Sequence, residues 1–204
     1  MNELNRALDE ISDIRRQVAR TTEFRGFGPA TLATTGVFAL AGAWAQSLWV
    51  PRAAMHSWDY VGLWSLTALA STILAGVHMY TRSRRIHSRL SDEMIYMAVE
   101  QFLPALGAGL LLTVVLLRTV PNLAWMLPGL WQVIFSLGIF ASSRFLPRPI
   151  MVAGVWYLLT GLICLGLGGA RALSPWAMAI PFGAGQMLVA AILFFCGKAG
   201  GDEG

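Results

Sequence analysis

Two glutamines stand inside long apolar runs of this 204-residue chain. Gln132 and Gln186 each follow a proline, Pro128 and Pro181, and each lies three residues after a glycine. Within a bilayer an amide can bond one helix to another, and beside a broken helix it can also line the path of a polar solute. We favour the structural interpretation, because Asp, Glu, Lys and Arg are absent from the middle of every apolar run and such charges usually mark ion pathways.

The surroundings of the two glutamines repeat. Each stretch has an arginine, then a tryptophan, then the series of Pro, Gly and Gln, which suggests duplicated helical hairpins. In that case Gln132 and Gln186 lie at equal depth near the middle of the membrane. Pro128 and Pro181 would break or kink their helices in the outer half and free backbone carbonyls, which groups on neighbouring helices could bind.

The histidines, acidic residues and serines offer less chemistry. His78 and Glu100 flank a basic loop and could meet as a hydrogen-bonded or ionic pair, with pH or ligand sensing as the alternative. A metal site needs three or four ligands, and His56 and His87 are not placed to complete one. Ser142 has no histidine and carboxylate close by in the sequence. We therefore expect no catalytic residue, no metal and no cofactor.

Three further arginines, Arg52, Arg118 and Arg171, each precede a tryptophan beside an apolar run. Arginine and tryptophan at helix ends anchor a protein at the membrane interface, and this is the favoured role. The alternative is a shallow anion site that the three arginines form together on the outer side.

The composition indicates which elements must position these residues. Hydrophobic residues make up 56% of the chain and charged residues 13%, which leaves too little polar surface to coat a water-soluble globule. A spanning helix needs about 20 mostly apolar residues and satisfies its own backbone hydrogen bonds in lipid. The pattern predicts an all-α membrane protein of one domain, residues 26–197, with a short tail at 198–204. Its six transmembrane helices, packed as three antiparallel hairpins, are expected at 29–50, 60–80, 97–117, 123–143, 150–169 and 176–196.

The distribution of basic residues predicts the orientation, since Lys and Arg collect in cytoplasmic loops. Only three of the fifteen lie on the other side. The cytoplasmic twelve are Arg6, Arg15, Arg16, Arg20, Arg25, Arg82, Arg84, Arg85, Arg89, Arg144, Arg148 and Lys198. We expect a bacterial inner membrane protein with both termini in the cytoplasm. The basic charge then reflects topology and attraction to anionic lipid headgroups, so direct binding of nucleic acid is not expected.

Residues 1–25 predict a cytoplasmic amphipathic helix. Leu4, Leu8, Ile11 and Ile14 recur every three or four residues and draw an apolar stripe along one side. The stripe suits the membrane interface, and the alternative is a docking helix for a second copy of the chain or for a soluble partner.

Three stretches carry a resemblance to a known group of proteins. They are "DEISDIRRQVARTTEFRGFG", "LPGLWQVIFSLGIFASSRFLP" and "LSPWAMAIPFGAGQM". Together they resemble a group of uncharacterised bacterial six-helix membrane proteins with no assigned biochemical activity. The resemblance implies a gene that lies near small helix-turn-helix regulators, and it transfers no functional residue.

These observations favour one function over two others. The preferred hypothesis is a non-enzymatic regulatory or accessory membrane protein, which presents its cytoplasmic helix and arginine-rich loop to a soluble partner or to a second copy. The alternative is a small transporter or channel with a polar site at Gln132 and Gln186 in the middle of the membrane. An enzyme ranks third, because the residues for chemistry are missing from the pattern.

Overall fold

The structure, a computed structural model, describes residues 29–199 apart from positions 52, 54–55, 87–88 and 146–147. Within these ranges the regular elements are helices, as the composition predicts. They are α2 (Pro29–Trp49), α3 (Ser57–Ile86), α4 (Arg89–Thr119), η1 (Pro121–Met126), α5 (Leu127–Ser142), η2 (Ser143–Phe145), α6 (Ile150–Leu167), α7 (Gly169–Ala172) and α8 (Trp176–Ala199). The amphipathic helix expected at residues 1–25 lies outside the described residues.

Five helical stretches are long and apolar enough to cross a membrane, by length and composition. They are Ser57–His78, Val99–Thr119, Pro121–Ser142, Ile150–Leu167 and Gly169–Phe195. Each falls in a region where the sequence predicts a span. The chain is therefore a multi-pass α-helical protein of membrane character.

The first predicted span, α2, has 21 residues but is less apolar than the other five. Three of its polar residues, Thr31, Thr35 and Gln46, are buried. Thr34 and Ser47 are exposed, and their hydroxyls donate to backbone carbonyls of α2 itself. Its exposed side includes Leu40 and Trp44. Buried polar side chains and exposed hydroxyls that bond within their own helix both fit a lipid environment, so a sixth span at α2 stays our prediction.

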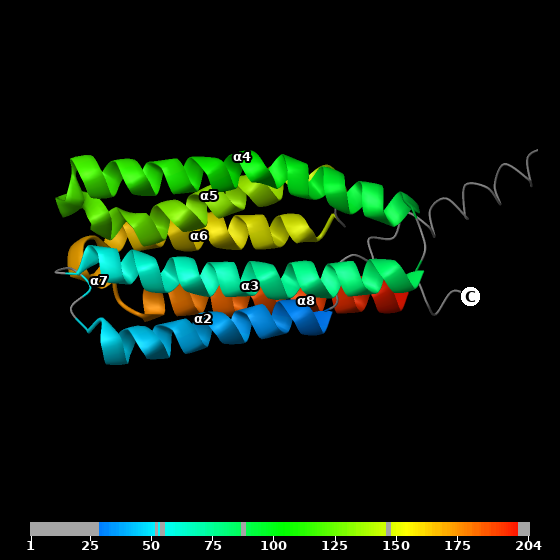
Figure 1. The fold of residues 1–204 in the computed structure, drawn as a ribbon, viewed down its shortest axis with the longest axis horizontal. Coiled ribbons are helices and arrows are strands. Elements are labelled where there is room, and N and C mark those ends of the chain that lie inside the picture. Colours follow the sequence, from blue (N-terminus) through cyan, green and yellow to red (C-terminus); the bar gives the residue numbers. More distant parts are fainter. Residues whose placement is uncertain (1–28, 52, 54–55, 87–88, 146–147, 200–204) are drawn as a thin grey trace, which may run out of the picture.

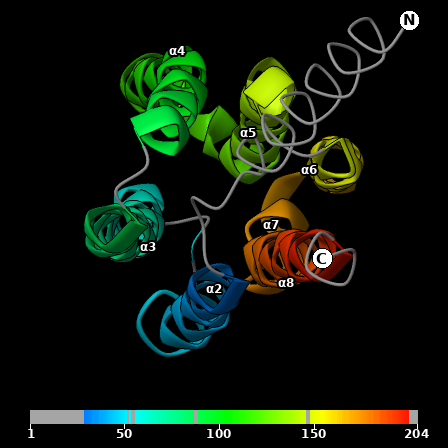
Figure 2. The same ribbon diagram turned by 90° about the vertical axis from the view of Figure 1, so that its right-hand side faces the viewer.

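Seen from one end, the helices stand side by side in a closed ring in the order α2, α3, α4, α5, α6 and α8 (Figure 2). The most extensive packing joins α5 to α6 and α2 to α8, so the first and last long helices close the ring. Helix α4 also packs well on α5, whereas α3 and α4 touch each other only slightly. The strongest contacts therefore do not follow the three predicted hairpins.

The ring has two chemically different ends (Figure 1). At the first, which we call the tryptophan end, α2 finishes, α3 and α8 begin, and η1 and α7 form the connections. Trp49, Trp58 and Trp176 lie there and are exposed. At the opposite end, the basic end, α3 finishes and α4 and α6 begin. The loop expected to be richest in arginine belongs to this end.

Glycines allow the closest helix pairs to pack backbone against backbone. A Cβ atom on Gly161 of α6 would lie 2.9 Å from the Gly129 carbonyl oxygen of α5. On the other side of the ring, a Cβ on Gly36 of α2 would lie 3.2 Å from the Gly183 carbonyl oxygen of α8. Small residues at such positions promote helix association in lipid, where the hydrophobic effect between helices is lost.

Candidate functional site

Gln132 is fully buried and bonds α5 to α8. Its Nε2 donates a hydrogen bond of 2.9 Å to the Ala177 carbonyl oxygen. In a regular helix that carbonyl would accept from the backbone N–H four residues later, but residue 181 is a proline and has no N–H. The Gln132 amide thus supplies the donor that Pro181 removes. This is the bonding of a freed carbonyl by a neighbouring helix that the sequence suggests.

A second side chain bonds the α8 backbone at the same proline. The Trp156 Nε1 of α6 donates to the Pro181 carbonyl oxygen at 3.0 Å. Donors from α5 and α6 therefore bond two α8 carbonyls that lie four residues apart. In lipid, where water does not compete, such bonds allow a proline inside a spanning helix.

Pro128 acts differently from Pro181. It occupies the first turn of α5, directly after the 3₁₀ helix η1, and is fully buried. A proline in the first turn costs no helical hydrogen bond, because the first N–H groups of a helix have no intrahelical acceptor. Pro128 marks a break between η1 and α5, whereas α8 continues through Pro181.

Gln186 does not lie at the depth of Gln132. It stands nine residues after Ala177, the residue that Gln132 bonds, which places it about 13 Å further along the α8 axis. Its Cβ lies against Gly36 of α2. The Tyr157 hydroxyl of α6 lies near its side chain but makes no hydrogen bond of good geometry. The expected equal depth of the two amides is wrong, because α5 and α8 are offset along their axes.

A third glutamine, Gln46, is buried and joins three parts of the fold. Its Nε2 donates to the Leu173 carbonyl oxygen at 2.7 Å, just before α8. Its Oε1 accepts from the Trp64 Nε1 of α3 at 2.8 Å. The amide hence ties α2 to α3 and to the connection between α7 and α8. Sequence analysis missed it because Gln46 lies near the end of an apolar run, where a polar residue is unremarkable.

Seven of the eight tryptophans fall into two groups. Trp64, Trp131 and Trp156 point into the ring and donate hydrogen bonds; the Trp131 Nε1 donates to the Thr113 Oγ1 of α4 at 2.8 Å. The exposed tryptophans are Trp44, Trp49, Trp58 and Trp176. Only this second group fits the interface and lipid-facing role that the sequence suggests for tryptophan-rich helices. Inward and outward tryptophans look alike in sequence, since both stand in apolar runs.

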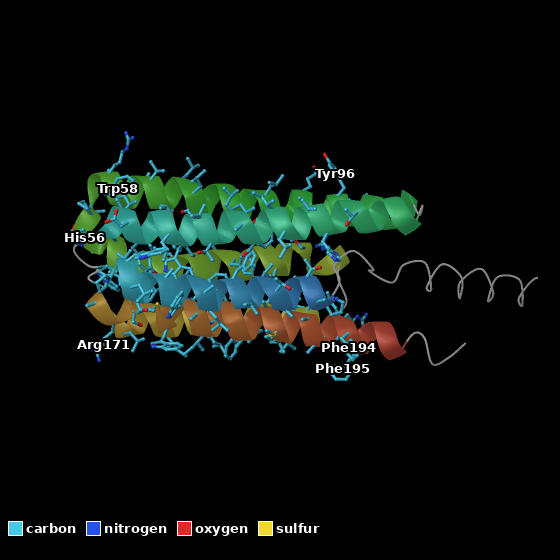
Figure 3. The ribbon with its side chains drawn as sticks, turned by 60° about the horizontal axis from the view of Figure 1, so that its bottom comes forward. His56, Trp58, Tyr96, Arg171, Phe194 and Phe195 are labelled. Carbon is cyan, nitrogen blue, oxygen red and sulfur yellow. The ribbon has the colours of Figure 1, made fainter. Side chains whose placement is uncertain are left out.

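The other predicted site residues lie at the two ends. His78 and Glu100 are both exposed, and no ion pair or hydrogen bond joins them. Arg171, His56 and Trp58 lie at the tryptophan end, while Tyr96, Phe194 and Phe195 lie toward the basic end (Figure 3). Arg118 is exposed in the last turn of α4, and Arg52 lies outside the described residues. The anion site stays a prediction for this reason.

The part of the chain that the structure describes contains few residues arranged for metal binding or thiol chemistry. Over those residues, no three His, Cys, Asp or Glu side chains group closely enough to hold a metal ion. Cys164 is buried, has no disulfide partner, and lies 3.7 Å from the Ala172 carbonyl oxygen. Its place is within the packed core near the tryptophan end.

Comparison of the chain with protein-family models, curated proteins and solved structures finds no match. The fold and the buried bonds nonetheless define a class. This is a multi-pass α-helical membrane protein, in which glutamine and tryptophan side chains bond each long helix to at least one other helix.

Proposed function

We propose that the chain is a non-enzymatic regulatory or accessory protein of the bacterial inner membrane, which binds a partner through its basic end. One observation carries the proposal. Helix α3 continues for eight residues, 79–86, beyond its apolar stretch, and α4 begins ten residues, 89–98, before its own. At 1.5 Å per residue the two extensions are about 12 and 15 Å long. Crossing the bilayer requires neither of them.

The sequence of these extensions suits contact with another molecule in water. They hold Arg82, Arg84, Arg85 and Arg89, followed by an acidic pair at 92–93. The two charged extensions are helical, so they form a helical projection rather than a long irregular loop. The positive-inside rule predicts a cytoplasmic position for this projection and for the apolar stripe expected in residues 1–25. A soluble protein with an acidic, partly apolar surface fits both features.

The buried polar groups support a scaffold better than a transport path. The amide hydrogens of Gln46 and Gln132 are engaged by backbone carbonyls. Because Gln132 and Gln186 lie at different depths, they do not face each other as a paired polar site. This weakens the alternative of a small transporter or channel, because that alternative depends on a polar site formed by both glutamines. Helix-to-helix bonds would instead fix the ring from which the projection extends.

The test is affinity purification of the full chain from its own membranes after mild cross-linking. Two variants are compared with it: one lacking residues 1–24, and one with R82Q, R84Q and R85Q, which keeps enough basic residues to maintain the orientation. The control carries R118Q and R171Q at the tryptophan end. We expect the control to retain a soluble partner. The amount of that partner recovered should fall at least ten-fold with at least one of the two basic-end variants. Recovery of the same proteins with all four versions would refute the proposal.

A further inference from the structure

Helix α4 also contains an internal proline, and its freed carbonyl is treated differently from that of α8. Pro104 has no N–H, so the Glu100 carbonyl oxygen lacks its helical donor. No side chain among the described residues bonds that carbonyl. At Pro181 of α8, by contrast, Gln132 donates to the freed carbonyl. The α4 backbone therefore presents an acceptor for a donor from outside the described part of the chain.

This freed carbonyl lies within the depth of the hydrocarbon core. From Gln101, the residue after Glu100, to Leu117, the helix rises about 24 Å, whereas the core is about 30 Å thick. Glu100 and Gln101 are both exposed. Lipid chains offer no donor to the carbonyl and no acceptor to the Gln101 amide, and unpaired polar groups are costly in lipid. Both groups therefore favour contact with a polar partner over contact with lipid.

The carbonyl and the amide belong to an exposed stripe on the side of α4 away from α5. Thr113 faces α5, because its hydroxyl accepts from Trp131, and a Cβ on Gly109 would lie 3.7 Å from Ile134. In Figure 2, α4 stands in the ring between α3 and α5. The stripe, which we call the α4 stripe, has exposed residues at alternating intervals of four and three: Met97, Gln101, Pro104, Ala108, Leu111 and Val115. This is the spacing of a seam between two helices.

The inner half of the α4 stripe differs in residue type from the surfaces that face lipid elsewhere. Helix α3 exposes Leu66 and Ile73, and α8 exposes Phe194 and Phe195. The inner half of the stripe instead has an amide, a proline and an alanine. A Cβ added at the neighbouring Gly107 would meet no atom within 4 Å. Small residues let helix backbones approach closely in lipid, so a side chain of a second helix can reach the α4 backbone here.

We propose that the α4 stripe is the contact between two copies of this chain in the membrane. A two-fold axis along the membrane normal places each residue opposite its counterpart at equal depth. The Gln101 amide of each copy donates to the Glu100 carbonyl oxygen of the other, so the bond forms twice. A second copy supplies this donor at the right depth, whereas lipid has none. Leu111 and Val115 pack against their counterparts nearer the tryptophan end. The contact does not depend on the proposed partner at the basic end.

Cysteine cross-linking in native membranes tests the contact. The full chain carries C164A and C196A, and A108C then places a single thiol on the α4 stripe. The control, I73C, places the thiol on the exposed side of α3 instead. On oxidation we expect several-fold more covalent dimer from A108C than from I73C. Equal amounts from the two variants, or no dimer from A108C, would overturn the proposal.

Two variants test the polar part of the contact, with Kd measured by energy transfer between labelled copies in mixed micelles. Q101L removes the donor, and P104A gives the Glu100 carbonyl a helical N–H of its own. Two hydrogen bonds of the average strength found in a membrane protein correspond to a rise in Kd of about eight-fold in Q101L. P104A should raise Kd in the same direction, and L110A, on another exposed side of α4, should leave it unchanged. An intact chain that stays monomeric, or a Kd that neither Q101L nor P104A changes, would refute the proposal.

Discussion

The hydrogen bond between Gln132 and the α8 backbone allows a quantitative prediction. Its acceptor, the Ala177 carbonyl, lacks a helical donor because residue 181 is a proline. In Q132L the amide donor is replaced by an apolar side chain of similar size. The Ala177 carbonyl then stays buried without a donor, since Pro181 has no N–H to offer. A buried polar group left unpaired costs about 1–3 kcal/mol, and side-chain hydrogen bonds inside a membrane protein average about 0.6 kcal/mol. We expect Q132L to lower the free energy of unfolding by about 1–2 kcal/mol.

The variant P181A changes that cost. Alanine at position 181 has an N–H, which can donate to the Ala177 carbonyl as in an ordinary helix. In this background the carbonyl no longer depends on Gln132, so Q132L should cost only about 0.5 kcal/mol. The difference between the two costs is a coupling energy of about 1 kcal/mol.

The assay is reversible unfolding of the four proteins, wild type, Q132L, P181A and the double variant, in mixed micelles. Q46L serves as the control, because Gln46 bonds Leu173 and Trp64 and shares no partner with Pro181. The costs of Q46L and P181A should add within about 0.5 kcal/mol. Additivity of Q132L and P181A to the same precision would refute the reasoning, since Gln132 would then not replace the missing donor.

Three further predictions concern packing, bonding and orientation. G161A should lower the free energy of unfolding by about 1–3 kcal/mol in the same micelle assay, since its Cβ would meet a backbone oxygen of α5 at 2.9 Å. G166A, where a Cβ meets no atom within 4 Å, should stay within about 0.5 kcal/mol of the wild type; equal costs would contradict this account. W64F should cost about 1 kcal/mol because a buried amide oxygen loses its donor, and an unchanged midpoint would speak against that bond. A membrane-impermeant maleimide should label T119C in intact cells and R144C only after permeabilisation, whereas the reverse result would invert the orientation.

The sequence predicts the class of protein and the positions of most helices, because length and hydropathy are sufficient for that purpose in lipid. It also predicts that Pro181 frees a carbonyl which a neighbouring helix binds. It does not predict which helix provides the donor. In a membrane the outside of a helix is as apolar as the inside, so hydropathy does not tell which face of α5 meets α8. The same limitation explains why Trp64, Trp131 and Trp156 are indistinguishable in sequence from the exposed tryptophans.

The error about equal depth has a different origin. The two Pro, Gly and Gln series align in sequence, but Pro128 begins an α-helix whereas Pro181 lies well inside one. Gln132 follows a helix start after η1, whereas Gln186 lies in a helix that is continuous through its proline. The two glutamines therefore lie at different heights. The register between helices depends on contacts such as that of Gly129 with Gly161, which only the folded chain reveals.

The distribution of buried contacts along α3 bears on the proposed function. Near the tryptophan end, Tyr60 and Trp64 bind the helix to its neighbours, and Gly42 of α2 packs against Thr67. Beyond Thr67, the described side chains of α3 are half-buried or exposed, and α3 has only a few contacts with α4. A helix fixed at one end and loosely packed toward the other can adjust its far end at little cost in packing energy. The far end of α3 is the arginine-rich extension. A partner could therefore bind there with little rearrangement of the tryptophan end, where α3 is bonded to its neighbours.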